Sequence, residues 1–335
     1  MSELKFDIPI ALFIFKRKDT TLRIIERIAK VRPQKLYLIA DYGRDEKEIE
    51  LVTESRKAVE KSINWDCEVV KYYAEQNRGV YANIGEGAKW VLSREEWAIF
   101  LEDDNLPEVT FFYYCKELLE KYKDSHKILW ICGTNYLGKY DSADHVSYMF
   151  TQHLLPCGWA SWSDKFLKYY DGEMETFANL DTKKMLQKNY TDKNLFRYQY
   201  RLFEKTRYKL KNDRKICSWD YQMAYSVRLN DMYGISPIYN QIKNIGVDEF
   251  SEHNGTSFRY VMTRRFCGMA SYPLEMPLRH PMEIKCDAKY EKLTGKIILP
   301  PLRVRMQTKC GDIMKRLLGI DRDASLLLYL KRKNR

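Results

Sequence analysis

The sequence predicts an α/β fold in which helices flank a central, mostly parallel sheet. In the first half of the chain, short apolar runs alternate with longer segments whose apolar residues recur every three or four positions. This alternation is typical of βαβ units, in which helices join parallel strands. The chain has 335 residues, and 45% of them are hydrophobic. It can therefore bury a large core, either as two domains or as one α/β unit with an appendage.

Each apolar run in the first half is an expected strand, and each amphipathic segment is an expected helix. The expected strands are residues 8–15, 35–43, 67–73, 97–103 and 128–133. The expected helices are residues 19–31, 46–63, 83–96 and 108–123. In open sheets of this kind, ligands bind beyond the carboxyl ends of the strands. The more aromatic second half contains a helical stretch at residues 182–213, and we expect this half to fold over the ligand edge.

The composition narrows the class of protein. No apolar run approaches the roughly 18 to 20 residues of a membrane-spanning helix, and the N-terminal apolar stretch is expected to be a strand and not a signal peptide. The eight cysteines are scattered singly, without CxxC or zinc spacing. We interpret them as reduced thiols of a cytoplasmic protein. The segment "IGEGAKW" lacks the P-loop pattern and no G-x-G-x-x-G follows a strand, so its glycines are expected to serve helix packing.

Most of the net charge of +11 lies in the last forty residues, which we call the tail. Residues 296–335 contain eleven Lys and Arg against three Asp, a surplus of eight, which leaves +3 for the first 295 residues. The tail also contains "IILPPL", "IMKRLLGI" and "SLLLYL". It is expected either to lie as an amphipathic segment on an anionic membrane surface, or to pack on the domain or a second subunit as in a homodimer. The body shows no nucleic-acid-binding motif, so nucleic acid is not an expected partner.

Three consecutive carboxylates, Glu102, Asp103 and Asp104, end the apolar run of "EEWAIFLEDDNLP". Like charges repel unless a cation lies between them. Mg²⁺ or Mn²⁺ bound by one or two carboxylates usually completes its coordination with water and substrate phosphates. The alternative is that the carboxylates cap a helix beginning near Pro107. The motif therefore predicts either a metal-bound diphosphate site or a helix cap.

The run "AIFLEDDNLP", after "NRGVYANIGEGAKWVL", resembles the nucleotide-binding half of GT-A fold glycosyltransferases. The EDD form resembles N-acetylglucosaminyltransferase I. The wider pattern "PIALFIFKR … LYLIAD … NRGV … LEDD … GWASW … WDYQ" is similar to bacterial family 2-like transferases of polysaccharide gene clusters, and it covers roughly residues 8–255. The resemblance implies a Rossmann-like GT-A fold, a nucleoside-diphosphate sugar donor such as a UDP-sugar, and a Mn²⁺ or Mg²⁺ cofactor. It also implies an inverting transfer to a saccharide or lipid-linked saccharide acceptor, in capsule or O-antigen synthesis.

The same resemblance divides the chain and assigns the donor site. It implies a nucleotide-sugar-binding half at residues 1–135, an acceptor half at 136–260 and a C-terminal extension at 261–335. Asp104 is the implied metal ligand, with Asp103 on the ribose or a metal-bound water. Glu102 is implied either to orient its neighbours or to contact the donor sugar. The implied nucleotide-binding residues are Phe15, Lys16, Arg17, Asp41, Asn77 and Arg78. The turn "ADYGR" departs from the family pattern, which leaves the role of Arg44 open.

The acceptor side requires a general base to take a proton from the attacking hydroxyl. Asp220 in "CSWDYQ" is either that base, as the resemblance implies, or a helix cap. Trp159 and Trp162 in "GWASW" are expected to form a turn in which an indole face contacts sugar, or else to pack in the core. His253 is either a further metal or pyrophosphate ligand or a structural residue, and Asp248 and Glu249 are the reserve bases.

Two other classes of protein remain as alternatives. A nucleotidyltransferase that forms sugar nucleotides is expected to have a Gly-rich basic loop after the first strand, whereas "FKRKDT" has no glycine. A non-catalytic carbohydrate-binding protein at the membrane surface would keep the aromatic residues but would not need the EDD and WDYQ motifs.

Overall fold

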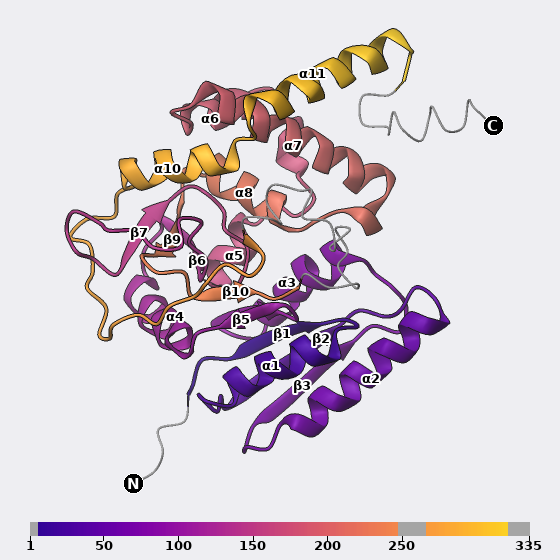
Figure 1. The fold of residues 1–335 in the computed structure, drawn as a ribbon, viewed down its shortest axis with the longest axis vertical. Helices are drawn as coiled ribbons and strands as arrows, with labels where there is room; N and C mark the ends of the chain where they lie inside the picture. Colours follow the sequence, from indigo (N-terminus) through magenta and orange to yellow (C-terminus); the bar gives the residue numbers. More distant parts are fainter. Residues whose placement is uncertain (1–5, 247–265, 321–335) are drawn as a thin grey trace.

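The computed structural model describes residues 6–246 and 266–320, which build on one large sheet (Figure 1). The strand order is β3-β2-β1-β4-β8-β6-β9-β7. The strands are β1 (Ile10–Ile14), β2 (Lys35–Ala40), β3 (Glu68–Tyr73), β4 (Trp97–Glu102), β6 (Ile128–Cys132), β7 (Tyr148–Thr151), β8 (Trp159–Trp162) and β9 (Tyr233–Pro237). Only β8 and β7 run antiparallel to their neighbours in this sheet. The predicted α/β fold with a mostly parallel sheet is therefore confirmed, and so are its five expected strands.

Helices cover both faces of this sheet, which makes a three-layer arrangement. The helices are α1 (Lys18–Ile28), α2 (Glu46–Ser62), α3 (Gly87–Leu92), α4 (Val109–Tyr122), α5 (Ser163–Tyr169), α6 (Thr182–Lys188), α7 (Lys193–Asn212), α8 (Asp220–Leu229), α10 (Ala288–Ile298) and α11 (Leu302–Leu317). Shorter helical turns are η1 (Tyr81–Glu86), η2 (Glu175–Ala178) and η3 (Arg214–Ile216). None of the helices in the described ranges is long and apolar enough to cross a membrane.

Alternation along the strands divides the core between the two faces. Ile10, Leu12 and Ile14 of β1 belong to a core that also includes residues of α1, α2, α4 and α10. Ala11 and Phe13 belong to the second core, which includes residues of α3 and α5 to α8. Successive strand residues point to opposite faces, so a strand buried on both sides is apolar throughout. The glycines of "GEG" belong to the second layer. A Cβ on Gly87 would lie 3.1 Å from the ring of Phe13, which confirms the helix-packing interpretation.

The segment "GWASW" is a buried strand, and the expectation of an exposed turn is wrong. It forms β8, which lies between β4 and β6. Trp159 and Trp162 are each only 1% exposed, and the indole N–H of Trp162 donates to the carbonyl of Leu119.

The C-terminal region is continuous with the domain before it separates. The expected tail at Lys296 begins inside α10, whose Tyr290 is fully buried against the sheet. By contrast, α11 has no buried residue. Both halves of the expected division contribute strands to the same sheet, and the domain boundaries at residues 135 and 260 remain predictions.

Candidate active site

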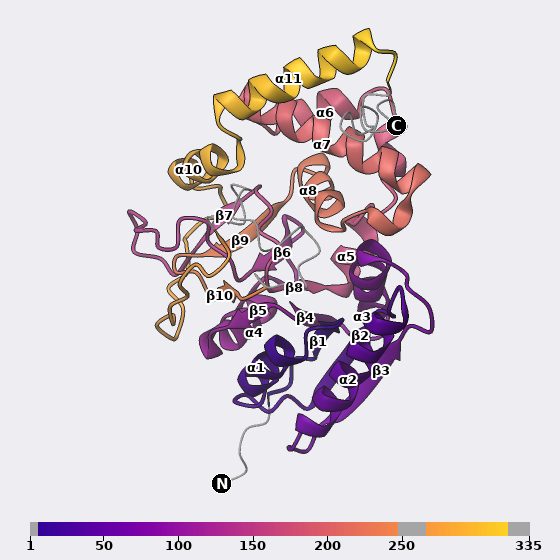
Figure 2. The ribbon, with the colours of Figure 1, turned by 45° about the vertical axis from the view of Figure 1, so that its right-hand side comes forward.

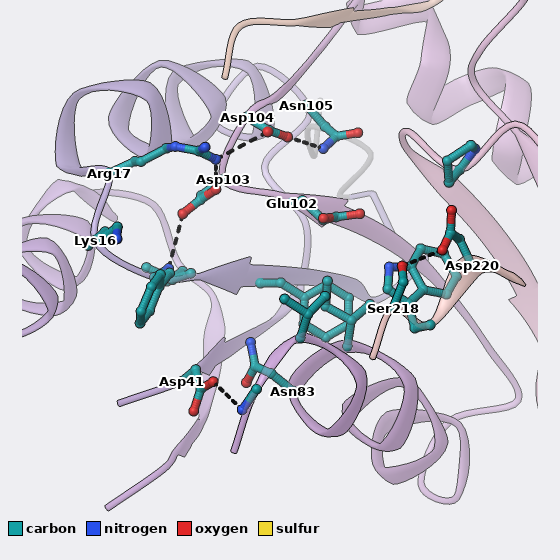
Figure 3. A pocket seen from close by; sticks show the side chains of 18 of the residues that line it. Lys16, Arg17, Asp41, Asn83, Glu102, Asp103, Asp104, Asn105, Ser218 and Asp220 are labelled. Carbon is teal, nitrogen blue, oxygen red and sulfur yellow. Dashed lines mark hydrogen bonds and ion pairs between the residues drawn. The ribbon is translucent and has the colours of Figure 1, made fainter. Parts of the chain in front are cut away.

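A cavity of about 840 Å³ opens at the carboxyl ends of β1, β2 and β4 (Figure 3). Parallel pairing of β1 with β2 and β4 brings these three strand ends together. A two-stranded sheet of β5 (Asn105–Pro107) and β10 (Ile242–Asn244) lies beside it. Cavities of roughly 300 to 1,000 Å³ are usual for small-molecule sites. Most of the candidate residues line this cavity: Phe15, Lys16, Arg17, Asp41, Asn77, Glu102, Asp103, Asp104 and Asp220.

The acidic end of β4 is held by groups that follow β1. The backbone N–H of Phe15 donates to Asp103 at 3.1 Å. One guanidinium nitrogen of Arg17 donates to Asp103 at 3.2 Å and to Asp104 at 3.1 Å. Asn105 donates to the other oxygen of Asp104 at 2.6 Å. The cation that electrostatics requires between the two aspartates is thus supplied, within the chain, by Arg17.

Arg17 does not fully offset the crowded negative charge. Burial raises the pKa of Asp103 to about 6, with Arg17 opposing the rise and Asp104 adding to it. Burial also raises the pKa of Glu102 well above its usual value, and the charges of Asp104, Asp103 and Asp220 add to that rise. Figure 3 shows Glu102 between the Arg17 group and Asp220. Further positive charge in this part of the cavity would therefore be stabilising.

The same residues meet the requirements of a divalent cation only in part. Within residues 6–246 and 266–320, no group of three or more His, Cys, Asp or Glu could hold a metal ion by itself. Mg²⁺ needs only one or two carboxylates when substrate phosphates and water complete its shell. Asp103 and Asp104 suit that open type of site. They do not cap a helix, since β5 follows them and α4 begins only at Val109, after Glu108 as its N-cap.

Asp41 organises the loop at the opposite side of the cavity. Its carboxylate accepts hydrogen bonds from the backbone N–H groups of Tyr42, Arg78 and Gly79 and from the side chain of Asn77, at 2.8 to 3.2 Å. These four bonds occupy its acceptor sites, so Asp41 holds the loop in place. Gly79 has φ +83° and lies against Lys215, where a Cβ would be 2.5 Å from the Lys215 carbonyl oxygen. The loop after β3 therefore lies between the end of β2 and the segment that precedes Asp220, and it contacts both.

The other basic residues of the expected donor site have partners in the chain. Lys16 forms an ion pair of 2.7 Å with Glu48, which also binds Arg44. Arg78 does not line the cavity. Its guanidinium lies 4.6 Å from the ring centre of Tyr72 and donates to Asn83. Asn77, Gly79 and Val80 of the "NRGV" loop thus line the cavity, whereas Arg78 does not.

Asp220 is the first residue of α8, at the far end of the cavity. The helix has Trp219 as its N-cap residue, and no side-chain cap bond is made. The side chain of Asp220 instead accepts a hydrogen bond from the hydroxyl of Ser218 (Figure 3). The helix-cap alternative for Asp220 is therefore not what the geometry shows. The carboxylate is oriented into the cavity with one hydroxyl donor beside it.

Besides Arg78, two expected site residues, Trp159 and Trp162, are absent from the cavity wall. Trp159 and Trp162 lie in the core, so the proposed sugar contacts of their exposed faces are corrected. His253, with the reserve acids Asp248 and Glu249, lies outside the described residues. The Trp159 ring stacks between the rings of Phe100 and Trp130, with ring centres 4.0 and 4.5 Å apart, and so packs β8 against β4 and β6.

Sequence reasoning missed several groups on the cavity wall. Ser218 lies two residues before Asp220, a spacing that suits a local hydroxyl-to-carboxylate bond and was available as a signal. Asn105, which contacts Asp104, directly follows the acidic motif. Tyr136 and Phe266 stack at 4.0 Å beside the Asp220 end of the cavity, and their 130-residue separation left no local signal.

No protein-family model matches the chain, and no curated protein matches its sequence. Solved structures resemble it in part. A mannosyltransferase from Pyrobaculum calidifontis, in complex with GDP-Man and Mn²⁺, is 9% identical over 67% of this chain and 70% of its own, with a TM-score of 0.36. A UDP-glucose pyrophosphorylase complexed with UDP-glucose is 9% identical over 71% and 91%, with a TM-score of 0.35. A 4-diphosphocytidyl-2C-methyl-D-erythritol synthase from Anaerococcus prevotii is 12% identical over 60% and 85%, with a TM-score of 0.30. At such low scores these likenesses carry no argument about activity.

Proposed function

We propose that the chain is a glycosyltransferase that moves a sugar from a nucleoside-diphosphate donor to a hydroxyl of a saccharide or lipid-linked saccharide. The observation that carries the proposal is the division of one cavity between two acidic centres. Asp103 and Asp104 lie at the end of β4, and Asp220 lies at the start of α8. Glycosyl transfer with inversion needs both a site for the departing diphosphate and a separate base for the attacking hydroxyl.

The nucleoside is proposed to lie on the β1 and β2 side. Phe15 supplies a ring there, with Lys16 and Arg44 close to its face at 5.2 and 5.9 Å. Asn77 and the backbone of Gly79 line the same part of the cavity. Asp41 acts as a positioning residue, because its carboxylate is committed to the loop. This arrangement suits a flat base and a ribose with several hydroxyl groups.

The diphosphate is proposed to lie at Arg17, Asp103 and Asp104. A bound Mn²⁺ or Mg²⁺ would neutralise charge that develops on the leaving diphosphate, and Asp104 with Asp103 would hold it. Arg17 would bind phosphate oxygens once negative groups enter, since a guanidinium meets phosphate with paired N–H donors. Glu102 lies between this group and Asp220, where the donor sugar is proposed to bind (Figure 3).

Asp220 is the proposed general base. It would accept the proton of the acceptor hydroxyl as that oxygen attacks the sugar, on the face opposite the diphosphate, with inversion. Ser218 donates to the Asp220 carboxylate and thereby holds its orientation. Trp219, Tyr136 and Phe266 line the same cavity as Asp220 and would offer apolar surface to a bound acceptor. The proposed setting is bacterial capsule or O-antigen assembly.

Calorimetry with UDP tests the donor and metal sites together. Wild-type protein is expected to bind UDP only when Mn²⁺ or Mg²⁺ is present, and Asp104→Ala is expected to lose that binding. Glu75→Ala is the matched control, because Glu75 also lines the cavity but lies outside the acidic motif. Equal binding of UDP without metal, or unchanged metal-dependent binding in Asp104→Ala, would contradict the assignment.

A further inference from the structure

The positive charge of the chain is gathered by the fold into one region. Residues 182–216, which contain α6 and α7, hold twelve Lys and Arg against three Asp and Glu, and α11 holds five against one. Together these segments have a surplus of thirteen, whereas the whole chain has +11. The remainder of the chain is therefore slightly acidic, and the surplus of +3 in the first 295 residues comes from residues 182–216.

These basic helices lie together at one end of the molecule. In both views α11 lies across α6 and α7, at the end opposite α1 and α2 (Figures 1 and 2). The charges of two segments that are about a hundred residues apart in sequence are thus combined on one surface. We refer to α6, α7 and α11 as the basic cap.

The orientation of α11 is the reverse of the usual one for an amphipathic helix. Its partly buried side consists of Arg305, Gly311, Asp312 and Lys315. Its outward side carries apolar residues with large exposed fractions: Leu302 62%, Met306 59%, Ile313 51%, Met314 48% and Leu317 81%. A surface helix normally turns such a stripe toward the core. An outward apolar stripe on a soluble domain indicates a surface that another body covers.

We propose that the basic cap docks on an anionic lipid bilayer, with the outward stripe of α11 entering the interface. Apolar side chains beside many Lys and Arg are the features that bind such surfaces, because the chains enter the acyl boundary while the cations meet lipid phosphates. A second copy of the chain would bring a like-charged cap to the same surface, which is unfavourable. Nucleic acid would meet the charges but would leave the apolar stripe in water.

Docking in this way would bring the acceptor end of the cavity toward the lipid. Helix α7 belongs to the cap, and the turn after it, η3, contributes Lys215 and Ile216 to the cavity wall, close to Asp220. Ile216 is 59% exposed, which extends the apolar surface in that direction. The inference goes beyond the proposed transfer and does not depend on it, since membrane binding is measured without donor or acceptor.

The test is co-sedimentation of the full chain with vesicles of phosphatidylcholine alone or mixed with phosphatidylglycerol. Wild-type protein is expected to sediment with the mixed vesicles only, and less so at high salt. Lipid phosphates attract each nearby cation, so Lys183→Glu with Lys184→Glu is expected to weaken binding by at least about tenfold. Leu317→Asp is expected to weaken it through loss of insertion.

Matched controls separate docking from general effects of charge. Lys47→Glu with Lys57→Glu makes the same charge change on exposed residues of α2, and Met282→Asp alters a fully exposed residue outside the cap. Both are expected to sediment like the wild type. The proposal is overturned if wild-type protein does not sediment with the mixed vesicles, or if the cap and control variants behave alike. It is also overturned if the cap variants dissociate a dimer or release RNA without changing vesicle binding.

Discussion

Arg17 supplies the cation between Asp103 and Asp104 in the ligand-free chain. Its guanidinium contacts both carboxylates and the carbonyl of Gly246 at 3.4 Å. All three side chains in this group are largely shielded from water. A guanidinium in this place keeps the acidic end of β4 compatible with folding before any ligand binds. The residue therefore combines a structural role with its proposed role at the diphosphate.

Removing this guanidinium is expected to expose the repulsion between the carboxylates. Arg17→Gln should lower the free energy of unfolding by about 3 kcal/mol, because two poorly solvated acids lose their ion-pair partner. Added Mn²⁺ should then raise the unfolding temperature of the variant more than that of the wild type, since the metal replaces the lost charge. Thermal unfolding with and without Mn²⁺ measures both effects. An equal shift in the two proteins would show that Asp103 and Asp104 do not take up the cation.

Asp220 allows chemistry to be separated from binding. Asp220→Asn keeps the shape of the side chain but removes its capacity to accept the acceptor's proton, so transfer should fall by roughly 10² to 10⁴-fold. UDP binding measured by calorimetry should stay close to the wild-type value. Ser218→Ala should retain much more activity, because it loses only an orienting hydrogen bond. Near-normal turnover of Asp220→Asn would remove it as the base.

At the scale of elements, α10 is attached to the domain by a buried polar network. Glu291 accepts hydrogen bonds from Arg228 of α8 at 2.9 Å, and from Thr151 at 2.6 Å and the backbone of Gln152 at 3.2 Å. The ring of His153 contacts the Glu291 backbone carbonyl at 2.9 Å. The network thus ties α10 to α8 and to the end of β7.

This network predicts a loss of stability in acid. Burial opposes ionisation of Glu291, yet His153 and Arg228 hold its pKa below the usual value, while burial lowers the pKa of His153. The native state therefore binds fewer protons than the unfolded state at both sites. Stability from these groups is present above about pH 6.5 and falls as the pH decreases through the range of their folded pKa values.

Glu291→Gln isolates the contribution of this network. It should lower the free energy of unfolding at pH 7 by about 3 to 5 kcal/mol, because Arg228 is left charged and only 3% exposed. The variant should also lose at least as much stability as the wild type between pH 7 and pH 5, because the charge of Glu291 raises the pKa of His153 and its removal lowers that pKa further. Urea unfolding at both pH values gives the two quantities. Glu275→Gln, at a solvent-exposed ion pair, should match the wild type, and similar losses in both variants would contradict the network's role.

At the scale of the whole molecule, one sheet unites the chain while α11 remains outside its packing. The sheet takes β1 to β4 from the first hundred residues or so, and β6 to β9 from later ones. Helix α10 has buried residues where it packs on the sheet, whereas α11 has no buried residue. The folded unit of the described ranges therefore extends through α10 and does not require α11.

Truncation at two nearby points tests this boundary. A chain that ends at Pro300 should unfold at nearly the wild-type temperature, because the deletion removes no buried contact within the described residues. A chain that ends at Glu291 should unfold at a clearly lower temperature, since it loses the last part of α10 with the buried Thr294 and Gly295. Calorimetric unfolding compares the two. A large destabilisation of the longer chain would show that α11 is integral to the fold.

The sequence alone determined the elements whose pattern is local. The apolar runs of β1, β2 and β4 predict strands because both of their faces are buried, and the abrupt acidic end of β4 marks the ligand edge. Asp220 was identifiable at a helix start for a similar reason. The strand at "GWASW" could not be identified from the sequence, because two aromatic residues around small ones suit either a turn or a buried strand. The choice depends on the pairing of this segment with β4 and β6 on its two sides.

Only the tertiary structure decided which side chains the site residues contact. Arg17 lies between Asp103 and Asp104, although 86 residues separate it from the first of them, because β1 and β4 are parallel neighbours. Asp41 serves the loop at Gly79 for the same reason, through the neighbouring ends of β2 and β3. The side of α11 that faces outward depends on its docking against the other helices of the cap. Periodicity determines which residues share a face, but long-range packing determines what that face meets.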